Sequence, residues 1–374
     1  YSSVVAIVRD GKETDCLHEG DRAHVILSPT PFYAERGGQV GDTGTIRNDG
    51  SRAKVLDTFY AAGDLVVQDI SVEKGEFLTN TQVLSEVDVE RRWDIRRNHT
   101  ATHLLHEALQ NSLGGHVRQS GSLVSHEVLR FDFTHFQSLS REQLNSIERD
   151  INRMIMEDRH LSISEGTMVE AKKRGAKALF EEKYGDTVRI VEIPEICTEL
   201  CGGIHVDSTG QIGSFKIIKE ESIGSGIRRI VGVTGRNALQ LTQSTFDMLD
   251  TVKSQLGVDE KDIVPRLEEM HEQIRSMRKI NENLNFNLLL QNLDQNLNIQ
   301  HGAQGMKIIT GRFSDIDADL LRELGDEIKA KYQGTVIILA LIKTDGNVQL
   351  LAMADKIALQ AGVHAGKIIK ILAP

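Results

Sequence analysis

Short runs in which apolar and polar residues alternate fill the first ninety positions of the chain. A period of two residues predicts strands whose one face is buried, and turn signals such as Asp10-Gly11 and Asp49-Gly50 separate the runs. We expect a small β-barrel or sandwich over residues 1–90, with strands at 4–8, 22–27, 54–58 and 64–68. Residues 31–42 form a glycine-rich loop within it, made unusually polar by Glu35, Arg36 and Gln39.

The pattern then changes to a mixture of helical and strand periods. A helix is predicted over 87–113, with Gly114-Gly115 ending it, and a second over 141–158, with Ser140 as its cap. A third helix is expected over 168–180. Strands are expected at 121–124, 129–133, 188–193, 213–219 and 227–234. Residues 91–236 therefore predict an α+β domain.

The C-terminal third begins with a long helical region over 237–302. Its apolar residues come close to a heptad trace, with Asn281 filling one position; they are Leu267, Met270, Ile274, Met277, Leu284, Leu288 and Leu297. This stripe is expected either to pair with a second chain or to pack on its own chain. Residues 303–374 return to α/β, with strands at 306–309, 335–342 and 348–352 and helices at 316–331 and 364–372. The predicted fold class is α+β multidomain: a barrel, an α+β domain, a helical linker and a small α/β domain.

Composition narrows the classes of function. The chain has 374 residues, a net charge of −10 and three cysteines, which favours a reducing compartment over a disulfide framework. No apolar run is long enough to cross a membrane. A chain this acidic is no general nucleic-acid binder, so contact with RNA would need a local patch, for which Arg91, Arg92, Arg96 and Arg97 are the best candidates. The absence of an initiator Met and the apolar ending lead us to expect a piece of a longer protein.

Two distant segments offer metal ligands. His99 and His103 are four residues apart on a predicted helix and therefore share a face, as does His106. Cys201 and His205 flank Gly202-Gly203. Three imidazoles and one thiolate form a tetrahedral zinc set, which is a closed structural site if all four bind at once. Thr100 stands where zinc peptidases carry their catalytic Glu, so that reaction is disfavoured.

In order along the chain, four motifs resemble the C-terminal half of alanyl-tRNA synthetases, and the first two domains also resemble free-standing alanyl-tRNA editing proteins. The motifs are Phe32-Tyr33-Ala34-Glu35-Arg36-Gly37-Gly38-Gln39, His99-Thr100-Ala101-Thr102-His103, Gln119-Ser120-Gly121-Ser122 and Cys201-Gly202-Gly203-Ile204-His205. The resemblance covers essentially the whole chain and implies that the ATP-binding aminoacylation core lies upstream. The family usually has Thr at the position of Ile204.

The resemblance implies a zinc editing domain that hydrolyses tRNA(Ala) mischarged with serine or glycine. Zn²⁺ would be held by His99, His103, Cys201 and His205, and Thr102, Gln119 and Ser122 match positions that line the catalytic pocket. No general base stands out, although Glu107 and Asp132 are near in sequence, and Cys197 is a spare thiol. The family pattern also implies tRNA contact and homodimerisation through the C-terminal region, and a cytoplasmic location. The alternatives are a non-catalytic tRNA-binding fragment with structural zinc, or a free-standing deacylase, which the truncated ends disfavour.

Overall fold

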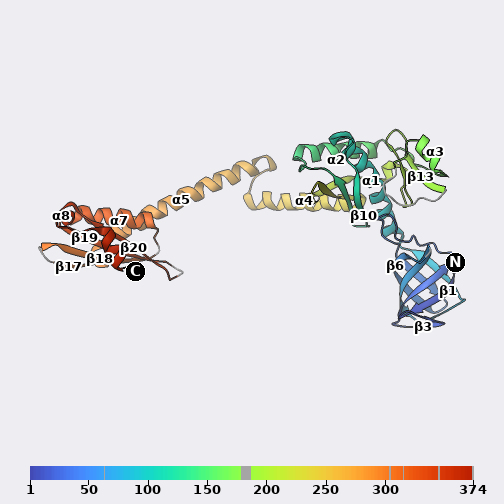
Figure 1. Cartoon of the computed structure of the whole chain (residues 1–374), viewed down its shortest axis with the longest axis horizontal. Coiled ribbons are helices and arrows are strands. Elements are labelled where there is room, and N and C mark those ends of the chain that lie inside the picture. Colours follow the sequence, from blue (N-terminus) through green and yellow to red (C-terminus); the bar gives the residue numbers. More distant parts are fainter. Residues whose placement is uncertain (63, 178–186, 303–304, 315, 344–345, 373–374) are drawn as a thin grey trace. The chain divides into compact units, whose positions relative to one another are not determined.

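The structure is a computed structural model that describes residues 1–62, 64–177, 187–302, 305–314, 316–343 and 346–372 (Figure 1). The chain divides into two compact units, Tyr1–Leu249 and Asp250–Pro374. The four domains predicted at 1–90, 91–236, 237–302 and 303–374 are a finer division and stay a prediction.

The first unit begins with the predicted barrel. Six antiparallel strands pair in the order β1-β4-β7-β6-β5-β9, and a β1–β9 pairing closes the sheet. The predicted alternation of apolar and polar residues explains why these strands form a barrel with a buried interior. In β4, for example, Ala23, Val25 and Leu27 point to the core while their neighbours face outward. β2 lies at the edge of β1, and β3 pairs only with β8. The strands are β1 Ser2–Arg9, β2 Lys12–Thr14, β3 Cys16–His18, β4 Arg22–Ser28, β5 Gly44–Asn48, β6 Ser51–Ala61, β7 Leu65–Lys74, β8 Glu76–Leu78 and β9 Gln82–Val87.

A long helix, α1 (Val89–Leu113), follows the barrel directly. The Asp88 side chain caps it by accepting a hydrogen bond from Arg91 N, and Gly114, at φ 109°, ends it. The helix starts two residues later than predicted because Val87 still belongs to β9. α1 packs on α2 (Arg141–Met156), which Ser140 caps as predicted. Behind them lies a four-stranded sheet, β10-β11-β16-β15, formed by Gln119–Val124, Leu129–Thr134, Ile227–Thr234 and Phe215–Gly224.

A small three-stranded sheet carries the cysteine segment. It consists of β12 (Ser162–Thr167), β13 (Thr187–Ile193) and β14 (Cys197–Leu200), with α3 (Met168–Lys173) beside it and the short helix η1 (Thr209–Ile212) further on. The prediction of a helix over 168–180 was wrong at its end. The backbone turns at Gly175, whose φ is 73°, so the helix cannot continue. The last part of that predicted range, 178–180, lies outside the described residues.

α4 (Gly235–Leu256) runs from the first unit into the second, where η2 (Glu260–Asp262) and α5 (Ile263–Gln291) follow. The helical region ends earlier than predicted. After the short α6 (Leu293–Asn296), Leu297–His301 is a strand, β17, because it pairs with β18 and this long-range pairing overrides the apolar period. Leu297 is therefore wrongly placed on the heptad trace.

The rest of the second unit is α/β, as predicted. The sheet β17-β18-β19-β20 contains β18 (Lys307–Ser314), β19 (Thr335–Ile342) and β20 (Val348–Ala354). α7 (Ala318–Lys331) covers it and buries Leu321, Leu324 and Ile328, and α8 (Lys356–Gln360) and α9 (Ala365–Leu372) follow. Among the described residues, no helix has both the length and the apolar character needed to cross a membrane.

Candidate metal centre

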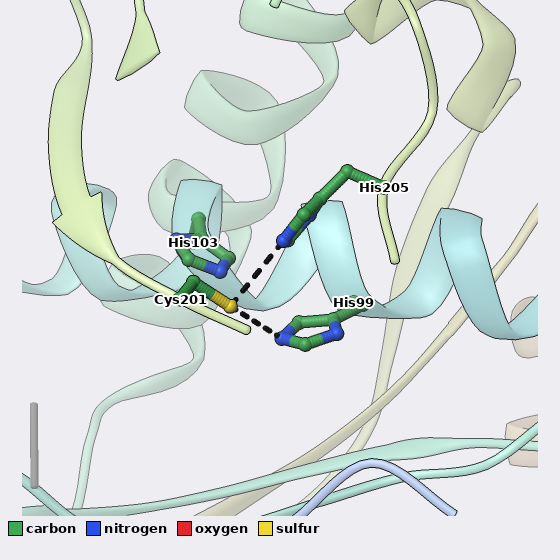
Figure 2. A group of neighbouring side chains, drawn as sticks. All are labelled: His99, His103, Cys201 and His205. Atoms are coloured by element: carbon green, nitrogen blue, oxygen red, sulfur yellow. Dashed lines mark hydrogen bonds between the residues drawn. The ribbon is translucent and has the colours of Figure 1, made fainter. Parts of the chain in front are cut away.

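The four residues predicted as ligands come together in the first unit (Figure 2). His99 and His103 lie one turn apart in the buried middle of α1, while Cys201 and His205 lie on the loop that follows β14. One donor atom from each residue lies within 4.8 Å of the others. The Cys201 Sγ atom is 3.3 Å from His99 Nε2 and 3.3 Å from His205 Nε2. Three imidazoles and one thiol, a donor set that suits a tetrahedral zinc ion, are thus assembled from two distant segments.

Each imidazole is oriented through its other nitrogen. His99 Nδ1 lies 2.6 Å from Gln39 Oε1, and His205 Nδ1 lies 3.2 Å from Thr100 Oγ1. His103 Nδ1 pairs with the Glu199 carboxylate. Because a partner at Nδ1 fixes the orientation of each ring, Nε2 is the nitrogen that each imidazole can offer to a metal. Such outer partners are typical of histidines that bind a metal, and this fits the donor set.

The cysteine loop is held in place along its backbone. Arg189, on β13, donates hydrogen bonds of 2.8 and 2.7 Å to the carbonyl oxygens of Cys201 and Gly203. Arg96, on α1, donates to the His205 carbonyl oxygen. A Cβ at Gly203 would overlap the His99 ring and press against Gln39 Oε1, so only glycine allows this approach. The loop geometry is therefore built around the ligand His99.

Burial and neighbouring charges set the ionisation of the centre. Burial opposes a thiolate, but His99 and His205 lower the pKa of Cys201 well below its ordinary value. Burial also opposes a charged His103, yet Glu199 raises the pKa of His103 well above its usual range. Against the effect of burial, His103 in turn lowers the pKa of Glu199 to about 2. Burial lowers the pKa of His205 to about 3. Both shifts favour the deprotonated forms of Cys201 and His205, which are the forms that a metal requires.

His106, the third histidine on this face of α1, does not join the ligand set. Its Nδ1 lies 3.1 Å from Glu199 Oε1, and its Nε2 lies 3.1 Å from Gln110 Nε2. Glu199 is only 1% exposed and so bridges the ligand His103 to His106. Cys197 is buried in the core beneath this bridge, where burial raises the pKa of its thiol.

The three predicted pocket residues lie around the centre without a direct bond to a ligand among the described contacts. The Thr102 hydroxyl donates to the Asn98 carbonyl oxygen at 2.9 Å, and Gln119 Nε2 donates to Ser122 Oγ at 3.2 Å. The barrel loop lies between Ser122 and the candidate ligand His99. Gly38 sits so close to Ser122 that a Cβ would clash with it, and the next residue, Gln39, contacts His99.

The candidates for a general base and for an RNA patch have internal partners. Glu107 pairs with Lys177 at 2.6 Å, and Asp132 accepts two hydrogen bonds from Arg229, of 2.6 and 2.8 Å. The four arginines at the start of α1 also bind within the chain; their partners are Gly41 for Arg91, Asp42 for Arg92, Asp207 for Arg96 and Asp94 for Arg97. Arg91 and Arg92 therefore join α1 to the barrel, whereas Arg96 and Arg97 join it to residues 205–211.

Sequence reasoning missed three residues that orient the ligands, namely Gln39, Thr100 and Glu199. Gln39 gave a signal, because it is a polar residue in a glycine-rich loop, where backbone often approaches a ligand. Glu199 lies two residues before Cys201, but the direction of its side chain is set by the pairing of β14, which the sequence alone does not show. Ile204 contributes through its backbone, since its N–H donates to Gln39 Oε1 at 3.0 Å.

Two family models match parts of the chain. The model described as Threonyl and Alanyl tRNA synthetase second additional domain matches residues 188–231, which include Cys201 and His205. The model for tRNA synthetases class II (A) matches residues 1–91, the barrel. The two matched sections meet where Ile204 N donates to Gln39 Oε1, so both sides of this contact are similar to parts of tRNA synthetases.

Curated relatives are similar over almost the whole chain. The alanine–tRNA ligase of Acetivibrio thermocellus is 41% identical over 367 residues, which is 98% of this chain. Those of Bacillus anthracis and Bacillus cereus are each 39% identical over 372 residues. The chain spans 42% of the length of these relatives. It is homologous to one part of alanine–tRNA ligases.

Proposed function

We propose that this chain is the editing part of an alanine–tRNA ligase and hydrolyses tRNA(Ala) mischarged with serine or glycine, with zinc as cofactor. The observation that carries the proposal is the convergence of His99, His103, Cys201 and His205, with Gln39, Glu199 and Thr100 orienting the three rings. Homology to alanine–tRNA ligases supports the substrate.

Editing answers a selectivity problem at the synthetic site. A pocket that accepts alanine cannot strongly reject glycine, which is smaller, or serine, which adds only a hydroxyl. A second, hydrolytic site removes these errors. In that site, Thr102, Gln119 and Ser122 supply the hydroxyl and amide groups that can bind the seryl hydroxyl, and alanine lacks the group that would pair with them.

An aminoacyl ester is reactive, so this chain needs little acid–base machinery. The oriented imidazoles and the Cys201 thiolate would hold Zn²⁺, which when bound supplies positive charge that activates water or positions the substrate. Gln39, Glu199 and Thr100 keep the three rings directed inward. The pairing of Glu107 with Lys177 and of Asp132 with Arg229 removes both carboxylates from consideration as bases.

Zinc analysis and deacylation assays test the proposal together. We expect at least one tightly bound zinc ion per chain and faster release of serine from Ser-tRNA(Ala) than of alanine from Ala-tRNA(Ala). Zinc-loaded protein that releases neither serine nor glycine would disprove the hydrolytic function. That result would favour the second candidate, a tRNA-binding part with structural zinc, which the complete set of four protein donors also suits.

A further inference from the structure

A second group of metal-binding side chains lies at the end of the barrel, away from the proposed zinc centre. Cys16, His18 and Glu76 each offer one donor atom, and these atoms lie within 4.8 Å of one another. Cys16 Sγ is 3.8 Å from His18 Nε2, and His18 Nδ1 is 3.9 Å from Glu76 Oε2. The group is formed by a two-stranded ribbon, β3 paired with β8.

The strand register places the three side chains on one face. His18 lies directly opposite Glu76, and Cys16 is two residues before His18 on the same strand. Side chains two apart on a strand, and those of directly opposed residues, share a face of the sheet. The residues between them, Leu17 and Phe77, are 0% and 1% exposed and fasten the other face to the barrel core. The ribbon is thus a fixed platform beneath three donors.

Backbone N–H groups hold the end of the platform at which His18 and Glu76 are paired. His18 N donates to Asp21 Oδ2 at 2.9 Å, and Asp21 N donates to the His18 carbonyl oxygen at 3.0 Å. Glu76 N donates to Ser51 Oγ at 3.0 Å. The Glu76 carboxylate makes the surroundings of Cys16 and His18 favourable for a cation, whereas the Asp21 carboxylate is already paired with Arg9 at 2.8 Å.

We propose that Cys16, His18 and Glu76 bind a second metal ion, of the borderline divalent class that includes Zn²⁺ and Co²⁺. A thiolate, an imidazole and a carboxylate, completed by water, suit such an ion in tetrahedral geometry. That geometry places donors roughly 3.3–3.6 Å apart, given metal–donor lengths of about 2.0–2.3 Å. The side chains of His18 and Glu76 are 71% and 60% exposed, so both are free to close the remaining gap. On binding, the Cys16 thiol releases its proton to solvent.

This site should be weaker than the buried centre, because it has three protein donors instead of four and must order exposed side chains. A metal ion bound at this site would stabilise the barrel. A bound ion would join β3 to β8, two strands far apart in sequence, and raise the melting temperature of the barrel.

The test uses the full chain, reduced, stripped of metal and titrated with Zn²⁺ or Co²⁺ alone against a chromophoric chelator. We expect two ions per chain, the weaker of which is lost in His18→Ala and in Cys16→Ser. His24→Ala, which removes another exposed histidine of the same barrel, is the matched control and should keep both ions. Cys201→Ser should lose the tighter ion and keep the weaker one. This variant therefore tests the barrel site separately from the proposed zinc centre and its function. A single ion in the unaltered chain, or a second ion that survives His18→Ala, overturns the site.

Discussion

Gln39 Oε1 lies 2.6 Å from His99 Nδ1, and this contact joins the barrel to the metal centre. The same oxygen accepts a hydrogen bond from Ile204 N at 3.0 Å, so one amide orients a ligand on α1 and also holds the loop that carries Cys201 and His205. Gln39 is 0% exposed, and water cannot replace it. The barrel therefore contributes directly to the geometry of the centre.

Replacing Gln39 by Leu should weaken zinc binding. The His99 ring would lose the partner that fixes its tautomer, and changes of this kind typically cost about 10–100-fold in metal affinity. Gln39→Glu keeps an acceptor oxygen and should retain more affinity than Gln39→Leu. Competition with a zinc chelator measures both variants. Equal affinities in Gln39→Leu and the unaltered chain would show that the contact does not orient the ligand.

Cys201→Ala should lower zinc content and deacylation together, because it removes the thiolate that lies 3.3 Å from two of the imidazoles. Elemental analysis and release of serine from Ser-tRNA(Ala) are the two measurements. Cys197→Ala is the contrasting variant: it removes a thiol that lies beside His103 and Glu199 but is outside the proposed ligand set, and it should keep the zinc ion. Full zinc occupancy with unchanged activity in Cys201→Ala would show that Cys201 is not a zinc ligand.

His106→Ala should affect stability more than zinc. The substitution removes one of the two imidazoles paired with the buried Glu199, and an unsatisfied buried acceptor costs about 1–3 kcal/mol. The free energy of unfolding of the zinc-loaded protein should fall by that amount while zinc content is kept. Denaturant titration and elemental analysis measure the two effects. Loss of zinc equal to that in His103→Ala would instead make His106 a ligand.

The sequence was sufficient to predict which four side chains come together at the candidate metal centre, because each half is a local pattern: a helical spacing in one segment and a cysteine and histidine that flank two glycines in the other. It also predicted the barrel, whose strands alternate cleanly. The orienting residues Gln39, Thr100 and Glu199 could not be assigned. These residues contact the histidines only through tertiary packing of the barrel loop, α1 and β14. Such contacts between distant segments cannot be read from the spacing of apolar and polar residues in one segment.

The errors at the end of the helical region have the same origin. Leu297 fits the apolar period of α5, but its backbone pairs with Gly311 of β18. Nearby Asn292, Asn296 and Asn298 are weak helix formers, so tertiary pairing prevails there. The internal partners of Arg91 and Arg92 could not be predicted either, since Gly41 and Asp42 are distant from them in sequence.

Thr102→Val should narrow the difference between the hydrolysis rates of Ser-tRNA(Ala) and Ala-tRNA(Ala). Val has nearly the shape of Thr but lacks the hydroxyl that can pair with the seryl group. Zinc content should stay unchanged, because the Thr102 hydroxyl donates to the Asn98 carbonyl oxygen and to no ligand among the described contacts. Thr100→Val is the contrasting variant: it removes the partner of His205 and should lower zinc and both rates. An unchanged ratio in Thr102→Val removes Thr102 from the discriminating set.

The exposed stripe of α5 predicts a dimer. Met277, Leu284 and Leu288 are 67%, 56% and 56% exposed, and Asn281 lies between them at a position where an Asn can fix the register of a coiled coil. Sedimentation of the full chain should give a dimer, and a fragment of residues 1–249, the first compact unit, should give a monomer. Leu284→Glu should dissociate the full chain, because it places a charge in the seam, whereas Glu282→Lys, a charge change at a neighbouring exposed position, should not. A full chain that stays monomeric at concentrations of tens of micromolar, where an interface with a dissociation constant of about 1 μM is occupied, would mean that α5 has no partner helix in a second copy.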